Sequence, residues 1–197
     1  TEAGLEILRE VKAATGLPVL TDVHREEDVE AVAAIVDCMQ IPAFLCRQTD
    51  FVQAVGRAGK PVNVKKAQFA APWDMKNVIK KIESTGNKKI LLTERGASFG
   101  YNTLVADMRS LIIMREMGYP VIFDCTHSVQ SPGGQGDTSG GDGRFAPYLA
   151  KAAAAVGVDG MFIETHPDPA NALSDGPNMI PLQQMSALWK KLVAIDQ

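Results

Sequence analysis

Short apolar segments alternate with longer helical patterns along this chain, and that alternation constrains its fold more than any other feature. The expected helices carry apolar residues at three- and four-residue spacing, and most are followed by a glycine, such as Gly16 or Gly157, that ends them. Strands are expected at residues 19–21, 38–41, 62–64, 90–93, 121–123 and 161–163, and helices before Gly16 and at 26–36, 50–58, 73–84, 104–117, 145–156 and 182–195. This order predicts an α/β protein with a parallel sheet covered by helices.

Reactive side chains follow every expected strand, and their distribution separates an open sheet from a barrel. An open sheet of this class often carries a glycine-rich G-x-G-x-x-G turn after a strand, and none is present. The residues at or just after the C-terminal ends of the strands are Asp22, His24, Gln40, Lys65, Lys66, Glu94, Arg95, Asp124, His127, Glu164 and His166. A ring of such residues is typical of the active face of a (βα)8 (TIM) barrel.

The expected strands are fewer than the eight of a closed barrel. Because the chain begins without Met and in a helical pattern, we predict that two βα units precede Thr1 in the full protein. Residues 1–197 would then form a single barrel domain with about six of its eight units. Residues 128–144 are rich in glycine, and a segment of this length at the active face predicts a mobile lid.

Composition excludes several classes of function. A net charge of −3 gives no reason to expect nucleic acid, and no segment approaches the ~20 apolar residues of a membrane helix. The three cysteines, Cys38, Cys46 and Cys125, have no metal-binding spacing and are odd in number, which favours buried thiols in a reducing compartment. The cytoplasm is the expected location.

Lys65 and Arg95 follow neighbouring expected strands, so their charges are expected to converge on a phosphate or carboxylate. The alternative is that Lys65 and Lys66 are a solvated pair and that Arg95 only pairs with Glu94. Arg47 is open to two interpretations, a second phosphate site or a surface contact, and spacing favours the surface contact.

Asp22 could accept hydrogen bonds from a sugar hydroxyl or cap the following helix. His127, Glu164 and Asp175 follow the last two expected strands and offer one imidazole and two carboxylates, which suits a divalent transition metal. A structural hydrogen-bond cluster is the alternative. His24 and His166 are expected to pack or to support other side chains.

Several longer motifs resemble one enzyme family in order and over essentially all 197 residues. They are TDVH at 21–24, QIPAFLCRQTD at 40–50, NVKK at 63–66, ERG at 94–96, FGYN at 99–102, DCTHSVQ at 124–130, the glycine-rich segment 132–141 and ETHP at 164–167. Together they resemble the 3-deoxy-D-manno-octulosonate 8-phosphate synthases. The related 3-deoxy-D-arabino-heptulosonate 7-phosphate synthases share the ERG and ETHP elements, but the segments around Arg47 and after Lys65 favour the octulosonate branch.

The resemblance implies a transferase of lipopolysaccharide biosynthesis. It would condense phosphoenolpyruvate with D-arabinose 5-phosphate and water, giving 3-deoxy-D-manno-octulosonate 8-phosphate and phosphate. The implied roles are phosphoenolpyruvate binding by Lys65, Arg95, Gln40 and the backbone at Ala43, pentose binding by Asp22, and pentose phosphate binding by Arg47 across a homotetramer interface. Catalytic roles would fall to Lys65, His127 and Asp175.

The resemblance also bears on a cofactor, because the family has metal-dependent and metal-independent members. His127, Glu164 and Asp175 match three ligands of a divalent ion such as Zn, Fe or Mn, and the fourth would be a cysteine on a strand before Thr1. Residues 174–178 look more like the metal-dependent branch; in the other branch no cofactor is expected. A heptulosonate synthase or a non-catalytic, anion-binding barrel fragment are the alternatives.

Overall fold

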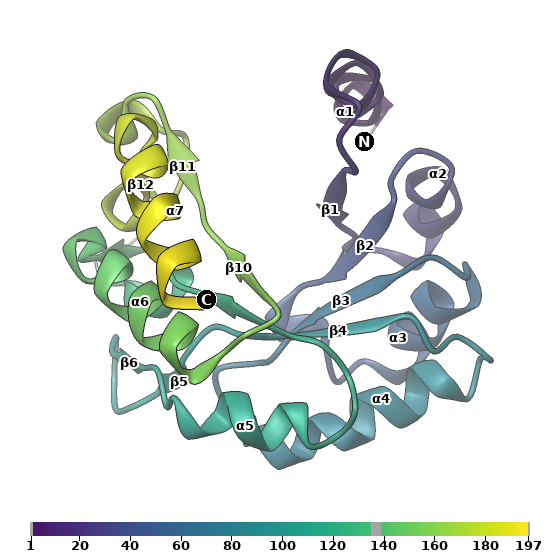
Figure 1. Cartoon of the computed structure of the whole chain (residues 1–197). Helices are drawn as coiled ribbons and strands as arrows, with labels where there is room; N and C mark the ends of the chain where they lie inside the picture. The colour runs from purple at the N-terminus through teal and green to yellow at the C-terminus, as the bar shows by residue number, and fades with distance from the viewer. Residues whose placement is uncertain (1, 135–138, 197) are drawn as a thin grey trace. The chain divides into compact units, whose positions relative to one another are not determined.

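The computed structural model describes residues 2–134 and 139–196 (Figure 1). The chain divides into two compact units, Thr1–Ala67 with Trp73–Leu92 and Gln68–Pro72 with Thr93–Gln197. Strand β4 (Ile90–Glu94) crosses the boundary between these two ranges, so its residues belong partly to each unit. Residues 135–138 of the predicted lid lie outside the described residues.

The first unit contains a parallel sheet in the order β1-β2-β3-β4. Its elements, in chain order, are α1 (Glu2–Thr15), β1 (Leu20–Asp22), α2 (Val29–Ala33), β2 (Cys38–Ile41), α3 (Thr49–Arg57), β3 (Val62–Lys65) and α4 (Met75–Glu83). Helix and strand alternate throughout, which confirms the predicted parallel α/β topology for this part of the chain.

Strand β3 is buried along its whole length, which explains both its apolar and its polar residues. Val62 and Val64 point to one side and Asn63 and Lys65 to the other, because side chains alternate along a strand. Covering both sides is typical of a parallel strand between crossover helices. The apolar faces of α3 and α4 supply much of the neighbouring core, with Phe51, Val52, Val55, Met75, Val78, Ile79 and Ile82 buried.

The second unit continues the parallel pattern with the end of β4, then β7 (Val121–Asp124) and β10 (Gly160–Phe162). Its helices are α5 (Arg109–Arg115), α6 (Ala146–Val156) and α7 (Leu182–Asp196), and α6 packs against α7. Asp124 stands beside Phe162 in the register of β7 and β10. The carboxyl ends of these strands therefore lead into the segments that carry His127 and Glu164.

Three pairs of two-residue strands in the described part of the second unit were not predicted. They are β5 (Ala97–Ser98) with β6 (Leu104–Val105), β8 (Gln130–Ser131) with β9 (Gly140–Gly141), and β11 (Thr165–His166) with β12 (Ile180–Pro181). Each pair closes a loop that follows one of the longer strands, and so fixes the backbone next to the candidate site.

The predicted helix at 104–117 was wrong at its start. Residues 104–105 pair with β5, and α5 begins only at Arg109. The carboxylate of Asp107 accepts a hydrogen bond from the backbone N–H of Arg109 at 3.0 Å, as expected next to a helix N-terminus. The glycines predicted to end the helices at 104–117 and 145–156 agree better with the structure, since Gly118 and Gly157 both have a φ of +86°.

Candidate active site

Three polar residues lie side by side at the carboxyl ends of the strands in the first unit. Asp22 of β1 is in register with Gln40 of β2, and Gln40 is in register with Asn63 of β3. Gln40 donates from Nε2 to Oδ1 of Asp22 at 2.5 Å, and Asn63 donates from Nδ2 to Oε1 of Gln40 at 2.7 Å. Asp22 is thus tied into the sheet and does not cap the following helix, whose first residues lack a side-chain cap.

Lys65 and Lys66 are both buried, with 5% and 1% of their surface exposed. The solvated pair considered above is therefore wrong for these lysines. Lys66 donates from Nζ to the carbonyl of Ala67 at 3.3 Å. Lys65 ends β3 on the same side as Asn63, two residues away, so it lies next to the Asp22–Gln40–Asn63 row.

Ala43 and Arg47 lie in the segment after β2. Ala43 begins a short 3-10 helix, Ala43–Leu45, and Arg47 follows it on the surface. The backbone carbonyl of Arg47 accepts a hydrogen bond from Lys81 at 2.8 Å, which fixes the chain there and leaves the guanidinium exposed. An exposed cation on a fixed backbone is compatible with either earlier interpretation.

Arg95, in the second unit, is buried and only partly satisfied. It is 6% exposed; Nη2 donates to Oε1 of Gln130 at 2.5 Å, and the buried Nη1 has no hydrogen-bond partner among the described residues. Burial lowers the pKa of the guanidinium, while Asp124, Asp175 and Glu94 act in the opposite direction. An arginine remains charged at neutral pH, so this is a buried cation with a free donor.

Glu94 shapes the turn that carries Arg95. Its carboxylate accepts hydrogen bonds from the backbone N–H of Gly96 at 2.7 Å and from the hydroxyl of Ser110 at 2.6 Å. Gly96 has a φ of +90°, a conformation that residues with a Cβ rarely adopt. The acid and the glycine therefore set the direction in which the arginine leaves β4.

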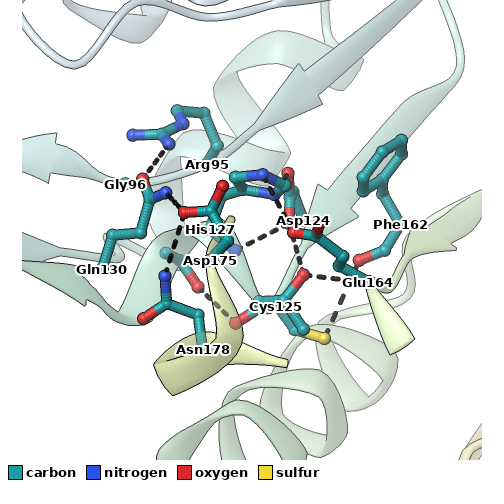
Figure 2. A network of polar contacts seen from close by, with 12 residues as sticks. Arg95, Gly96, Asp124, Cys125, His127, Gln130, Phe162, Glu164, Asp175 and Asn178 are labelled. Atoms are coloured by element: carbon teal, nitrogen blue, oxygen red, sulfur yellow. Dashed lines mark hydrogen bonds and ion pairs between the residues drawn. The ribbon is translucent and has the colours of Figure 1, made fainter. Parts of the chain in front are cut away.

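His127, Glu164 and Asp175 come together as predicted, with one potential ligand atom from each within 4.8 Å of the others (Figure 2). The imidazole lies between two carboxylates: Nε2 is 3.4 Å from Oε2 of Glu164, and Nδ1 is 2.7 Å from Oδ2 of Asp124. A proton held at Nδ1 by Asp124 leaves the Nε2 lone pair directed toward the cluster, an arrangement common for metal-binding histidines.

Hydrogen bonds to Asp124 and Thr126 fix the backbone that carries this cluster. Fully buried Asp124 accepts hydrogen bonds from the hydroxyl of Thr126 at 3.2 Å and from the backbone N–H of His127 at 3.0 Å. Thr126 in turn accepts the backbone N–H of Glu164 at 3.0 Å. The carboxylate of Asp124 thus orients the imidazole and, through Thr126, the segment between β10 and β11 that carries Glu164.

Gln130 connects the buried arginine to the third potential ligand. Figure 2 shows its amide between Arg95 and Asp175, accepting from the guanidinium and donating to Oδ1 of Asp175. Asn178 donates to the same oxygen at 3.4 Å. Asp175 has a left-handed backbone, with a φ of +54°, which is uncommon outside glycine and is often found at functional sites.

The donor set fits a divalent metal ion. One imidazole nitrogen and two carboxylate oxygens at this separation are ligands that Zn, Fe and Mn accept. His166 is not among them: its Nδ1 accepts the backbone N–H of Asp168 at 3.0 Å, which agrees with the packing role expected for it. His24 is exposed after β1.

Several contributors were not predicted as site residues, namely Asn63, Ser110, Thr126, Gln130 and Asn178. All are uncharged and act through other side chains, so residue type and spacing alone did not single them out. Thr126 and Gln130 lie inside the 124–130 motif, and that motif was the available signal.

Comparison with known proteins assigns the chain to a family. A family model described as the DAHP synthetase I family matches residues 1–197. The chain belongs to the DAHP synthetase I family.

Curated members of this family that resemble the chain carry the name 2-dehydro-3-deoxyphosphooctonate aldolase. The protein from Acidithiobacillus ferrooxidans is 63% identical over 195 residues, covering 99% of this chain and 69% of that protein. The protein from Variovorax paradoxus is 62% identical over 202 residues, covering 100% and 71%, and that from Nitrosococcus oceani is 61% identical over 196 residues, covering 100% and 70%. The resemblance inferred from the motifs is thereby confirmed.

Among the described residues, no helix combines the length and the apolar character needed to cross a membrane.

Proposed function

We propose that this member of the DAHP synthetase I family is a 3-deoxy-D-manno-octulosonate 8-phosphate synthase, a transferase of lipopolysaccharide biosynthesis. The observation that carries the proposal is 61–63% identity, over almost the whole chain, to proteins named 2-dehydro-3-deoxyphosphooctonate aldolase. Its substrates are phosphoenolpyruvate, D-arabinose 5-phosphate and water, and its products are the octulosonate 8-phosphate and inorganic phosphate.

The reaction forms a C–C bond and a C–O bond and releases phosphate. The π electrons of the C2=C3 bond of phosphoenolpyruvate form the bond from C3 to the aldehyde carbon, and the opened carbonyl oxygen of the pentose takes a proton. Water adds its oxygen to C2 and gives up one proton. The C2–O bond to phosphate then breaks as the new C2 hydroxyl loses its remaining proton, which leaves a ketone at C2 and free phosphate. Charge builds up next to phosphate and carboxylate groups, so fixed cations can stabilise the transition state.

Lys65 and Arg95 are proposed to hold the anionic groups of phosphoenolpyruvate, together with Gln40 and the backbone at Ala43. Their burial supports the assignment, because a cation removed from water attracts an anion more strongly than an exposed one. The free Nη1 of Arg95 supports it further, since a buried donor without a partner is unfavourable until a ligand accepts its hydrogen bond.

Binding of arabinose 5-phosphate is assigned to Asp22, for the sugar, and Arg47, for the phosphate group. Asp22 would accept a hydroxyl hydrogen bond. Exposed Arg47 would bind the phosphate of a pentose in a neighbouring subunit of a homotetramer. We assign catalytic roles to Lys65, His127 and Asp175.

His127, Glu164 and Asp175 are proposed to hold a divalent metal ion, which supplies a Lewis acid for the water or the aldehyde when bound. Asp124 keeps the proton on Nδ1 of His127, and Gln130 keeps Oδ1 of Asp175 in place. We further propose that the parallel strands of both units belong to one (βα)8 barrel and that the enzyme works in the cytoplasm.

Phosphate release by the full-length protein tests the function. Phosphoenolpyruvate is supplied with arabinose 5-phosphate in one series and with erythrose 4-phosphate in another, because the family name also covers heptulosonate synthesis. Release with the pentose alone is expected, with the eight-carbon product identified by mass spectrometry. Release only with erythrose 4-phosphate would assign the chain to the heptulosonate branch, and no release with either would leave an anion-binding protein.

A further inference from the structure

Asp22, Gln40 and Asn63 form a directional chain of hydrogen bonds across three neighbouring strands. They occupy one row of the parallel sheet, with Asp22 opposite Gln40 and Gln40 opposite Asn63. Gln40 and Asn63 are 5% and 2% exposed, whereas Asp22 is exposed. The row therefore runs from a buried amide to a carboxylate that solvent or a ligand can reach.

The chemistry of the carboxylate sets the direction of this row. A carboxylate only accepts hydrogen bonds, so the Gln40 atom next to it must be the donor Nε2. Oε1 of Gln40 must then face the other way and needs a donor, which is Nδ2 of Asn63. Because the two amides have this single compatible orientation, removing the buried donor of Asn63 allows Gln40 to turn.

We propose that Asn63 is a positioning residue for aldose recognition, acting through Gln40 on Asp22. Gln40 engages Oδ1 of Asp22, and Oδ2 accepts no hydrogen bond from any described residue, so it is free for a substrate hydroxyl. This role rests on the proposed function. The role extends the proposed function, because a buried asparagine then controls which aldose phosphate the enzyme accepts.

Asn63→Asp is the sharpest variant, because it is nearly isosteric and changes a donor into an acceptor. Gln40 must then turn its Nε2 toward residue 63, which brings Oε1 against the carboxylate of Asp22. The expected result is a lower melting temperature, an increase of about ten- to hundredfold in KM for arabinose 5-phosphate, and weaker discrimination against ribose 5-phosphate. Asn63→Ala, which adds no charge, is expected to change the same constants in the same direction by a smaller factor.

The double variant Asp22→Asn/Asn63→Asp separates positioning from packing. It restores every hydrogen bond in the row with reversed direction, since residue 22 now donates and residue 63 accepts. The melting temperature is expected to recover toward that of the unaltered protein, while KM for the aldose stays high because residue 22 is no longer a carboxylate.

Asn87 supplies the matched control within the same unit. It is also buried and donates to the carbonyls of Gly56 and Lys60, outside the row. Asn87→Ala is expected to lower the melting temperature without changing aldose KM or aldose discrimination.

Two outcomes would overturn the positioning role: unchanged aldose constants in both Asn63 variants, or the same kinetic change in Asn87→Ala. If the unaltered protein did not turn over arabinose 5-phosphate, the proposed function would fail instead. The melting temperatures of the single and double variants would still test the directional row, which predicts recovery in the double variant and is contradicted by additive losses.

Discussion

Arg95 and Lys65 are both buried cations, and the surroundings of Arg95 explain why it is expected to bind an anion. Arg95 has one nitrogen bound to Gln130 and another, Nη1, without a hydrogen-bond partner among the described residues. A planar guanidinium with a free donor can bind a carboxylate or phosphate in a way that an ammonium group cannot reproduce.

Arg95→Lys therefore tests geometry at constant charge. We expect kcat/KM to fall by an amount equivalent to about 2–4 kcal/mol of transition-state stabilisation, and Lys65→Ala to produce a loss of similar size. Steady-state kinetics with phosphoenolpyruvate as the varied substrate measures both. Arg109→Lys is the control, because Arg109 is exposed and pairs with Asp107; kinetics like those of this control would remove Arg95 from the site.

Gln130 gives a second prediction at this scale, because its amide joins Arg95 to Asp175. Gln130→Met keeps the approximate size and removes both hydrogen bonds. We expect metal affinity to weaken by about tenfold or more, the range typical of residues that hold a ligand in place, together with a higher KM for phosphoenolpyruvate.

Calorimetric titration with Zn or Mn measures metal affinity independently of turnover. Gln183→Met is the control, since Gln183 is exposed and its side chain donates to the carbonyl of Pro167, outside the cluster. If the Gln130 variant bound metal and phosphoenolpyruvate as tightly as the control, the bridge would have no functional role.

At the scale of elements, α1 depends on a polar tether, because none of its described residues is buried. Lys12 donates to Oδ1 of Asp37 at 2.8 Å and to the carbonyl of Ile35 at 3.3 Å. Asp37 also accepts the backbone N–H of Val19 at 2.9 Å, just before β1. One carboxylate therefore holds the helix next to the strand that carries Asp22.

The pH dependence of this tether follows from its charges. The hydrogen bond from Lys12, and then that from Val19, hold the pKa of Asp37 below its usual value. A lowered pKa contributes stability above the unfolded pKa, and that contribution is lost as the pH falls through the folded value. Protection of the α1 amides, meaning their exchange rate relative to the intrinsic rate at the same pH, is expected to fall in acid in the native protein. Asp37→Asn should already show low protection at neutral pH and respond less to acid. Equal exchange in the two proteins at neutral pH would contradict the tether.

The elements show what a sequence can and cannot predict. The six longer strands in the described part of the chain were predicted because an apolar run between helices has few alternatives in a parallel sheet. The strand pairs β5–β6, β8–β9 and β11–β12 were missed because two-residue strands carry no periodic pattern. The helix at 104–117 was predicted too long because Leu104 and Val105 fit a helical apolar face equally well, and only pairing with β5 decides against it.

Some residues of the candidate site could likewise be predicted from the sequence, and others could not. His127, Glu164 and Asp175 were predicted as a group because their residue types suit a metal, and the structure brings them together. The convergence of Lys65 with Arg95 stays a prediction. The orienting amides of Asn63, Gln130 and Asn178 could not be predicted, because their importance depends on which atom faces which neighbour.

At the scale of the whole molecule, metal binding is expected to raise the stability of the folded protein. A ligand that binds only the folded protein raises the free energy of unfolding, by about 2.7 kcal/mol when its concentration is one hundred times Kd. We expect Zn, Fe or Mn to raise the melting temperature of chelator-treated protein and Asp175→Ala to abolish that increase. Asp168→Ala is the control, since that exposed carboxylate is outside the cluster. A melting temperature unaffected by metal would leave His127, Glu164 and Asp175 as a structural cluster.

The family assignment agrees with the motifs, but the names used within the family refer to two different reactions. The family model is named for the heptulosonate enzymes, whereas the curated relatives cited above carry the octulosonate name. The parallel α/β topology does not decide between the two names, so the choice depends on the side chains proposed to contact the aldose, Asp22 and Arg47. Fold alone would not have separated the two reactions.

Two of the three cysteines are buried and Cys38 is partly buried, which has a practical consequence for spectroscopy. Cys46 and Cys125 are inaccessible, and burial raises the pKa of Cys46 and brings that of Cys38 to about 11. Maleimides and similar reagents attack the thiolate, which Cys38 and Cys46 barely form near neutral pH, and Cys125 is out of their reach. A cysteine introduced at Tyr101, which is 95% exposed between β5 and β6, would therefore accept a fluorescent or spin label while the native thiols remain in place.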